Sequence, residues 1–122
     1  MQKTLFERIG GQSAVEATVT KLYEKLLNDP ALAPFFSDAN MAELHRSQSA
    51  FVTMAFGGPH HYKSLDLRAV HLDARLNGLG HAHFDATLAH LQNAMRELDV
   101  PEDMILEASE IVESTRRDVL NL

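Results

Sequence analysis

The stretch from His83 to Val112, HFDATLAHLQNAMRELDVPEDMILEASEIV, carries the clearest pattern in the chain. Its apolar residues recur every three or four positions on both sides of a Val-Pro break, which is the spacing of an amphipathic helix. They are Phe84, Leu88, Leu91, Met95 and Leu98 before the break, and Met104, Ile105, Ala108, Ile111 and Val112 after it. We therefore expect one helix over 83–98 and a last helix from Pro101, at its first position, to about Val119.

Upstream segments show shorter patterns of the same kind. A capping-box pattern, S-x-x-E, opens the segment 13–28, and a similar N-x-x-E pattern opens 40–57. A short helix is expected within 64–76. Between the first two segments, residues 31–39 follow Pro30 and hold Pro34 and two adjacent phenylalanines, which indicates a bent apolar connector. No segment alternates as a strand does, so we expect an all-α protein with five or six helices around one core.

The composition is that of a single globular domain spanning residues 1–122. The chain is 45% hydrophobic and 23% charged, which is enough for a real core. It has no cysteine, which excludes disulfides, thiolate catalysis and thiolate metal sites. A net charge of −6 disfavours nucleic-acid partners, and no apolar run is long enough to cross a membrane. No secretory signal is visible, so we expect a cytoplasmic protein.

Three polar residues fall on helix faces that are otherwise apolar. Tyr23 follows Leu22, Gln48 lies on the stripe of Leu44, and His71 comes just before a glycine-rich break. Burying such groups costs a few kcal/mol unless a partner satisfies them. Each is by itself most often an ordinary core or boundary residue, so none of them identifies a function alone.

The other histidines form no convincing metal site. His60 and His61 are adjacent and project in different directions, so they are better interpreted as solvated loop residues. His83 and His90 share a helix face but lie two turns apart, too far for one ion, and His81 completes no set with them. The chain also shows no nucleophile with a partner pattern and no phosphate-binding loop.

Taken together, short strings over nearly the whole chain resemble the truncated haemoglobins of group I. They are Leu5–Gly11 (LFERIGG), Lys21–Glu24 (KLYE), Ala33–Phe36 (APFF), Gln48–Phe51 (QSAF), Ala55–Pro59 (AFGGP), Arg68–His71 (RAVH), His83–Asp85 (HFD) and Val100–Glu102 (VPE). Their order and spacing carry the resemblance, which extends from Leu5 to about Leu120. It implies a shortened globin, a two-over-two helical sandwich around haem.

The resemblance also implies residue roles. His71 is expected to be the proximal ligand of the iron. Phe36 is expected to pack against the haem, with Phe35 nearby. On the other side of the haem, Tyr23 and Gln48 would line the gas pocket together with Leu44. A phenol hydroxyl and an amide N–H both donate hydrogen bonds to partly negative dioxygen, at about 1–3 kcal/mol each.

Departures from the family pattern refine these expectations. Ser47 stands where some relatives have a second iron-binding histidine, and His45 is rotated away, so open or weakly occupied distal coordination is expected. Thr115 stands where some relatives attach haem covalently, so noncovalent haem b is expected. Glu43 stands where relatives have a basic residue for a haem propionate. Lys63, Arg68 or Arg46 are the candidates to replace it.

Three functions are compatible with these residues. The first is reversible binding of dioxygen, carbon monoxide and nitric oxide, as a carrier or sensor, by a protein expected to be monomeric. The alternative is a nitric oxide dioxygenase that uses the same haem with an external reductase. The third is a haem-free helical interaction domain in which His71, Tyr23 and Gln48 are ordinary core residues.

Overall fold

A computed structural model describes residues 4–36, 41–56, 71–72, 75–76 and 78–122, with only the backbone for 41–44, 47 and 48. All regular structure in these ranges is helical, which confirms the expected fold class. The elements are α1 (Leu5–Ile9), α2 (Gly11–Leu27), the 3-10 helix η1 (Ala33–Phe36), α3 (Met41–Ala55), α5 (His81–Glu97), α6 (Glu102–Glu113) and α7 (Arg116–Val119).

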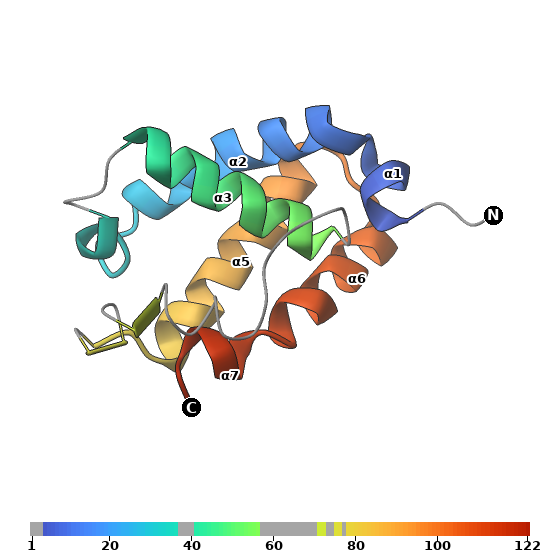
Figure 1. Ribbon diagram of the computed structural model, residues 1–122. Coiled ribbons are helices and arrows are strands. Elements are labelled where there is room, and N and C mark those ends of the chain that lie inside the picture. The colour runs from blue at the N-terminus through green and yellow to red at the C-terminus, as the bar shows by residue number, and fades with distance from the viewer. Residues whose placement is uncertain (1–3, 37–40, 57–70, 73–74, 77) are drawn as a thin grey trace.

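The long helices form two pairs. In Figure 1, α2 and α3 lie along each other, and α5 and α6 form the second pair beneath them. The pairs are joined where α2 packs on α5 and where α3 packs on α6. None of the helices in the described ranges has both the length and the apolar character needed to span a bilayer.

The core lies between these pairs and follows the periodicity of the sequence. Leu22, Val52 and Phe56 have no exposed surface, and Leu91 and Met95 of α5 meet them from the other pair. Burial of one such side chain contributes about 1.5–3 kcal/mol. Leu27 is an apolar residue outside this core, because it is 40% exposed at the end of α2.

The first two helices begin at positions that the capping prediction missed. Thr4 caps α1, because its hydroxyl accepts a hydrogen bond from Glu7 N at 3.2 Å. The predicted start of the second helix at Ser13 is wrong, because α2 begins at Gly11 and Ser13 is an exposed residue within it. Gly10 (φ 127°) and Gly11 (φ 67°) adopt backbone angles that other residues avoid, and they let the chain turn between α1 and α2 without a linker.

The last two predicted helices also differ in their bounds. α5 begins at His81 instead of His83, and Pro101 precedes α6 as its N-cap instead of occupying the first helical position. The single helix expected to reach Val119 is broken after Glu113. At the break, the hydroxyl of Thr115 donates to the carbonyl of Val112 at 2.6 Å, which satisfies a buried polar group at the end of α6.

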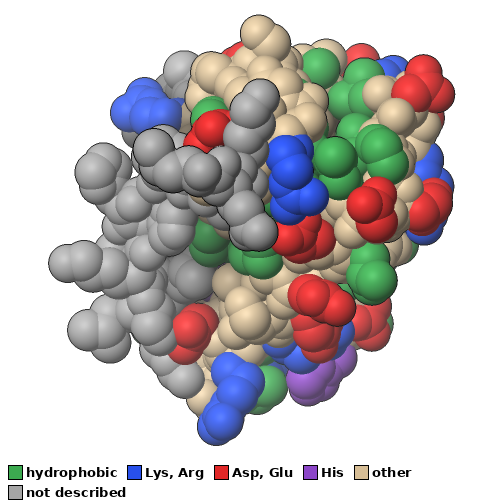
Figure 2. Space-filling view, turned by 90° about the vertical axis from the view of Figure 1, so that its right-hand side faces the viewer, with side chains coloured by type: hydrophobic (Ala, Val, Ile, Leu, Met, Phe, Trp, Pro, Cys, Tyr) green, Lys and Arg blue, Asp and Glu red, His purple; other side chains and the backbone are tan. Residues whose placement is uncertain are grey.

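Charges of both signs are interspersed on the face of the molecule shown in Figure 2. Ion pairs also link helices of the protein: Arg8 with Glu107, Lys21 and Lys25 with Glu97, and Arg96 with Glu102. Exposed pairs of this kind contribute little to stability individually. The charge on this face is therefore mixed and does not form a field of one sign.

Candidate functional site

Tyr23 is carried by α2 at the side of the core. The side chains before and after it on the helix, Leu22 and Leu26, are buried, whereas Tyr23 itself is half-buried. A phenol at the edge of an apolar face packs its ring there while its hydroxyl makes polar contacts. The half-buried position of Tyr23 is therefore better suited to a polar contact at a site than to packing inside the core.

Leu44 and Gln48 lie one turn apart on α3, the helix that packs along α2. The backbone of these two positions therefore lies on α3, directly beside α2, which carries Tyr23 (Figure 1). Their side chains are outside the described part of the chain. His45, between them, is directed to the exposed side of α2, where its Nε2 lies 3.1 Å from a carboxylate oxygen of Glu16.

His71 is a half-buried residue in helical conformation, located between α3 and α5 in the sequence. Two leucines that follow it are unusually exposed, Leu72 by 46% and Leu76 by 76%. The chain then turns back toward α5, where the guanidinium of Arg75 donates to the carbonyl of Leu79 at 2.7 Å. The candidate propionate partners Lys63 and Arg68 lie outside the described residues.

Phe35 and Phe36 lie on η1, and both are half-buried. Phe36 packs against the core, whereas the ring of Phe35 meets the imidazole of His83 edge-on, with 5.1 Å between centroids. The turn before η1 is organised by Asp29, whose Oδ1 accepts from Ala31 N at 2.9 Å. The other carboxylate oxygen, Oδ2, lies 2.8 Å from His90 Nε2, and this hydrogen bond is the main cause that lowers the pKa of Asp29 below its usual 3.8.

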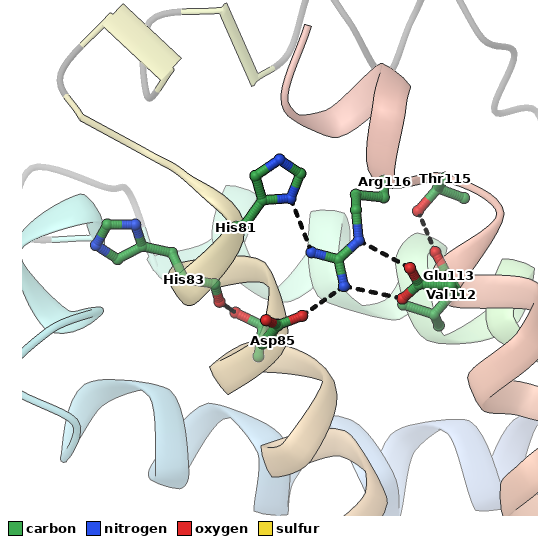
Figure 3. Close-up of polar contacts among 8 residues, drawn as sticks. His81, His83, Asp85, Val112, Glu113, Thr115 and Arg116 are labelled. Atoms are coloured by element: carbon green, nitrogen blue, oxygen red, sulfur yellow. Dashed lines mark hydrogen bonds and ion pairs between the residues drawn. The ribbon is translucent and has the colours of Figure 1, made fainter. Parts of the chain in front are cut away.

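A cluster around Arg116 joins the start of α5 to α7 (Figure 3). The guanidinium binds the carboxylates of Asp85 and Glu113 and lies 4.4 Å over the ring of Phe84. Its Nη1 is 3.1 Å from Nδ1 of His81. The hydrogen bond from Arg116 lowers the pKa of Glu113, and the two carboxylates raise the pKa of Arg116 in turn.

Sequence comparison matches this chain to known proteins. The family model of bacterial-like globins matches residues 4–121. A group 1 truncated haemoglobin from Synechocystis is 40% identical over 121 residues, covering 97% of this chain and 98% of its own. One from Tetrahymena thermophila is 38% identical over 119 residues, covering 98% and 96%. This chain belongs to the group 1 truncated haemoglobins. It is thus a globin, of a family that binds haem and gases.

Solved structures extend the likeness to the fold. The 2/2 haemoglobin of Synechococcus in the cyanomet state with covalently attached haem has a TM-score of 0.89 and 39% identity, covering 98% of this chain and 100% of its own. The truncated haemoglobin of Tetrahymena pyriformis in the Fe(III) form has a TM-score of 0.85 and 36% identity, covering 97% and 98%. The two-over-two sandwich expected for a truncated haemoglobin is therefore confirmed.

The donor groups of this truncated haemoglobin fit a haem better than a metal ion held only by side chains. Within the described ranges, no three His, Asp or Glu side chains gather as an ion site would require. A haem iron needs one protein ligand, which in globins is an imidazole, and His71 carries this group. The exposed side chains of Leu72 and Leu76 offer apolar surface for a porphyrin face to cover.

The contacts that hold η1 in this truncated haemoglobin were not predicted from its sequence. The sequence places His83 at the start of an expected helix, excludes His83 and His90 as a shared metal site, and predicts no partner for Asp29 or Arg116. One signal was present, because the two histidines are seven residues apart and so share a face of α5. Their partners on the connector are distant in sequence, and no local pattern predicts such pairs.

Proposed function

We propose that this truncated haemoglobin reversibly binds dioxygen and other diatomic gases, including carbon monoxide and nitric oxide, at a noncovalent haem b held by His71. The observation that carries the proposal is the half-buried Tyr23 on α2, packed along the helix that bears Leu44 and Gln48. A phenol and a carboxamide on adjacent helices are suitable donors for one small, partly negative ligand. When bound, the haem supplies the iron at which the gas is held.

Each residue has a distinct task in this proposal. The neutral imidazole of His71 holds the iron, and Tyr23 and Gln48 donate hydrogen bonds into the space that the gas enters. Leu44 keeps that space apolar, and Phe35 and Phe36 shield the haem from water. Lys63 and Arg68 are the proposed cationic partners of the propionates, because a guanidinium or ammonium pairs well with a carboxylate.

Noncovalent attachment is proposed from the chemistry of Thr115. Its side chain is 7% exposed, and its hydroxyl is engaged with the carbonyl of Val112. This residue stands where the resemblance places the attaching histidine of some relatives. A threonine offers no imidazole nitrogen for that bond, so acidified organic solvent is expected to extract all the haem and leave a protein of 13.6 kDa.

The test is haem titration of the purified protein. We expect one haem per chain and a Soret band that shifts with dioxygen and with carbon monoxide. The His71→Ala variant should lose the ordinary spectrum and regain it with added imidazole. His45→Ala is the matched control, because the exposed His45 of α3 pairs with Glu16 of α2, so the substitution should leave the spectrum unchanged.

Two results would overturn the proposal. One is a protein that stays free of haem after titration, and the other is a His71→Ala spectrum that matches the unaltered protein. Nitric oxide oxidation would use the same His71, Tyr23 and Gln48, and no additional described residue favours it. Reversible gas binding is therefore the function that we propose.

A further inference from the structure

His83 lies where two segments of the proposed haem site meet. Its Nδ1 accepts a hydrogen bond from the backbone N–H of Gly80 at 2.9 Å. The same imidazole meets the ring of Phe35 edge-on, with centroids 5.1 Å apart and planes at 74°. One side chain of α5 therefore contacts both the end of the stretch that follows His71 and the connector η1.

Hydrogen bonds among the described residues just before α5 stabilise the segment that reaches this contact. The guanidinium of Arg75 holds the carbonyl of Leu79 at 2.7 Å, and Gly78 N donates to the carbonyl of Arg75 at 3.2 Å. Gly80 then caps α5, and its carbonyl accepts from Phe84 N at 3.1 Å. The bond from Gly80 N to His83 adds a second attachment of this stretch to the helix.

The chain that leads into and through η1 contacts α5 at two points. Asp29, which organises the turn before η1, is 2.8 Å from His90 Nε2, and Phe35 within η1 contacts His83. His83 and His90 are seven residues apart, which places them on one face of α5 about 10 Å apart along its axis. The chain from Asp29 to Phe35 therefore runs along α5 between two histidine contacts.

We propose that His83 is a positioning residue that holds the chain following His71 and the Phe35–Phe36 connector in one fixed arrangement. The inference rests on the proposed function, because it assigns the proximal imidazole to one segment and the shielding rings to the other. The bond from Gly80 requires an unprotonated Nδ1, so the neutral ring carries its proton on Nε2. His83 acts through these two segments and does not itself touch the gas.

The two contacts use different parts of the imidazole, so substitutions can separate them. His83→Gln keeps an acceptor for the N-cap amide, as glutamine does in a capping box, but loses the ring against Phe35. His83→Phe keeps a ring and loses the acceptor. His83→Ala loses both. His81→Ala is the matched control, because His81 faces Arg116 while His83 points away from that cluster (Figure 3).

The first measurement needs no haem. Hydrogen exchange at the Gly80 amide should be slow in the unaltered protein and in His83→Gln, and about tenfold faster in His83→Phe and His83→Ala. The second measurement is the transfer of haem to an excess of a scavenger protein. Haem loss should be about tenfold faster in His83→Ala, with smaller increases in the two single-contact variants, and unchanged in His81→Ala.

A spectroscopic measurement separates positioning from simple helix capping. In the ferrous, gas-free protein, the iron–imidazole stretching frequency should shift in His83→Phe and His83→Ala, because the segment after His71 is released. A variant with faster Gly80 exchange but unchanged haem loss and frequency would overturn the inference and leave His83 as a helix cap only. If His83→Ala does not fold, the Gln and Phe variants give the same answer.

These outcomes are distinct from failure of the proposed function. An unaltered protein that takes up no haem contradicts the haem proposal itself. An unaltered protein that takes up haem, together with His83 variants that retain it equally well, contradicts only the positioning role of His83.

Discussion

The Nε2 of His90 lies 2.8 Å from Oδ2 of Asp29, across 61 residues of sequence. This contact ties the turn before η1 to the middle of α5, and both side chains are largely buried, with 25% and 20% exposed. His90→Leu should leave one carboxylate oxygen without this partner and loosen the turn. We expect the melting temperature to fall by roughly 3 °C, measured by circular dichroism.

The matched variant is His90→Gln, whose amide still has an N–H to donate to Asp29. It should recover at least half of the loss seen with His90→Leu. Equal melting temperatures for His90→Leu and the unaltered protein would show that the turn holds without the contact.

Acid should weaken the same contact. Hydrogen bonding by His90 lowers the pKa of Asp29 below 3.8, so its carboxylate stabilises the native state fully above that value. The contribution is lost as the pH falls through the lower native pKa. Between pH 5 and pH 3, the free energy of unfolding should therefore fall less in Asp29→Asn than in the unaltered protein. Urea unfolding at several pH values measures both slopes.

Other carboxyls contribute to the same trend. The pKa of Glu97 is lowered mainly by its hydrogen bond with Lys25, and that of Glu102 by Arg96. Asp29→Asn should therefore reduce the acid sensitivity without abolishing it. Identical slopes for the variant and the unaltered protein would contradict the assigned role of Asp29.

Local patterns predicted the helices but not all of their ends. The periodicity from Phe84 to Met95 correctly indicated a helix whose apolar side faces the core, because burial of that side determines its position. The start of α2 was missed, since it depends on the positive φ of Gly10 and Gly11, which the composition permits but does not specify. Residues 4–7 match the T-x-x-E capping pattern, but this match was not used to predict the cap at Thr4.

The site was predicted in a different way. Periodicity marked Tyr23 as an oddly polar residue, but only the family resemblance assigned it and His71 to a haem. Neither the periodicity nor the family resemblance predicted the contacts of Phe35 with His83 or of Asp29 with His90. These pairs join residues that are distant in sequence and meet only once the connector has folded along α5.

Arg116 is expected to stabilise the junction of α5 and α7. Its side chain is only 19% exposed, and it binds two carboxylates and covers a phenyl ring. Arg116→Met keeps much of the apolar stem but removes the charged contacts. Because the carboxylates of Asp85 and Glu113 are themselves more than half exposed, we expect a loss of about 1–2 kcal/mol in the free energy of unfolding.

Arg117 provides the control for that measurement. It is the next residue and its side chain is exposed, so Arg117→Met should change the free energy of unfolding by less than about 0.5 kcal/mol. Arg116→Lys should recover only part of the loss, because an ammonium cannot bridge two carboxylates as a planar guanidinium does. Equal losses for Arg116→Met and Arg117→Met would argue against the cluster.

Gly11 should resist substitution for a reason of backbone geometry. Its φ of 67° lies in the left-handed region, while a Cβ there would meet only Phe6, at 3.9 Å. Gly11→Ala should therefore cost about 1–2 kcal/mol in the free energy of unfolding through the backbone and not through a clash. Gly11→Asn should cost less, since asparagine tolerates this region better. Equal effects of the two substitutions in urea unfolding would contradict this explanation.

The proposed gas pocket predicts how Tyr23 and Gln48 act together. Tyr23→Phe and Gln48→Leu each remove one donor, so dioxygen should dissociate about tenfold faster or more from each variant in stopped-flow mixing. If both donors serve the same ligand, the double variant should deviate from the product of the single effects. Carbon monoxide takes on little negative charge, so its dissociation should change much less and serves as the internal control. Equal changes for the two gases would mean that the substitutions opened the pocket instead of removing hydrogen bonds.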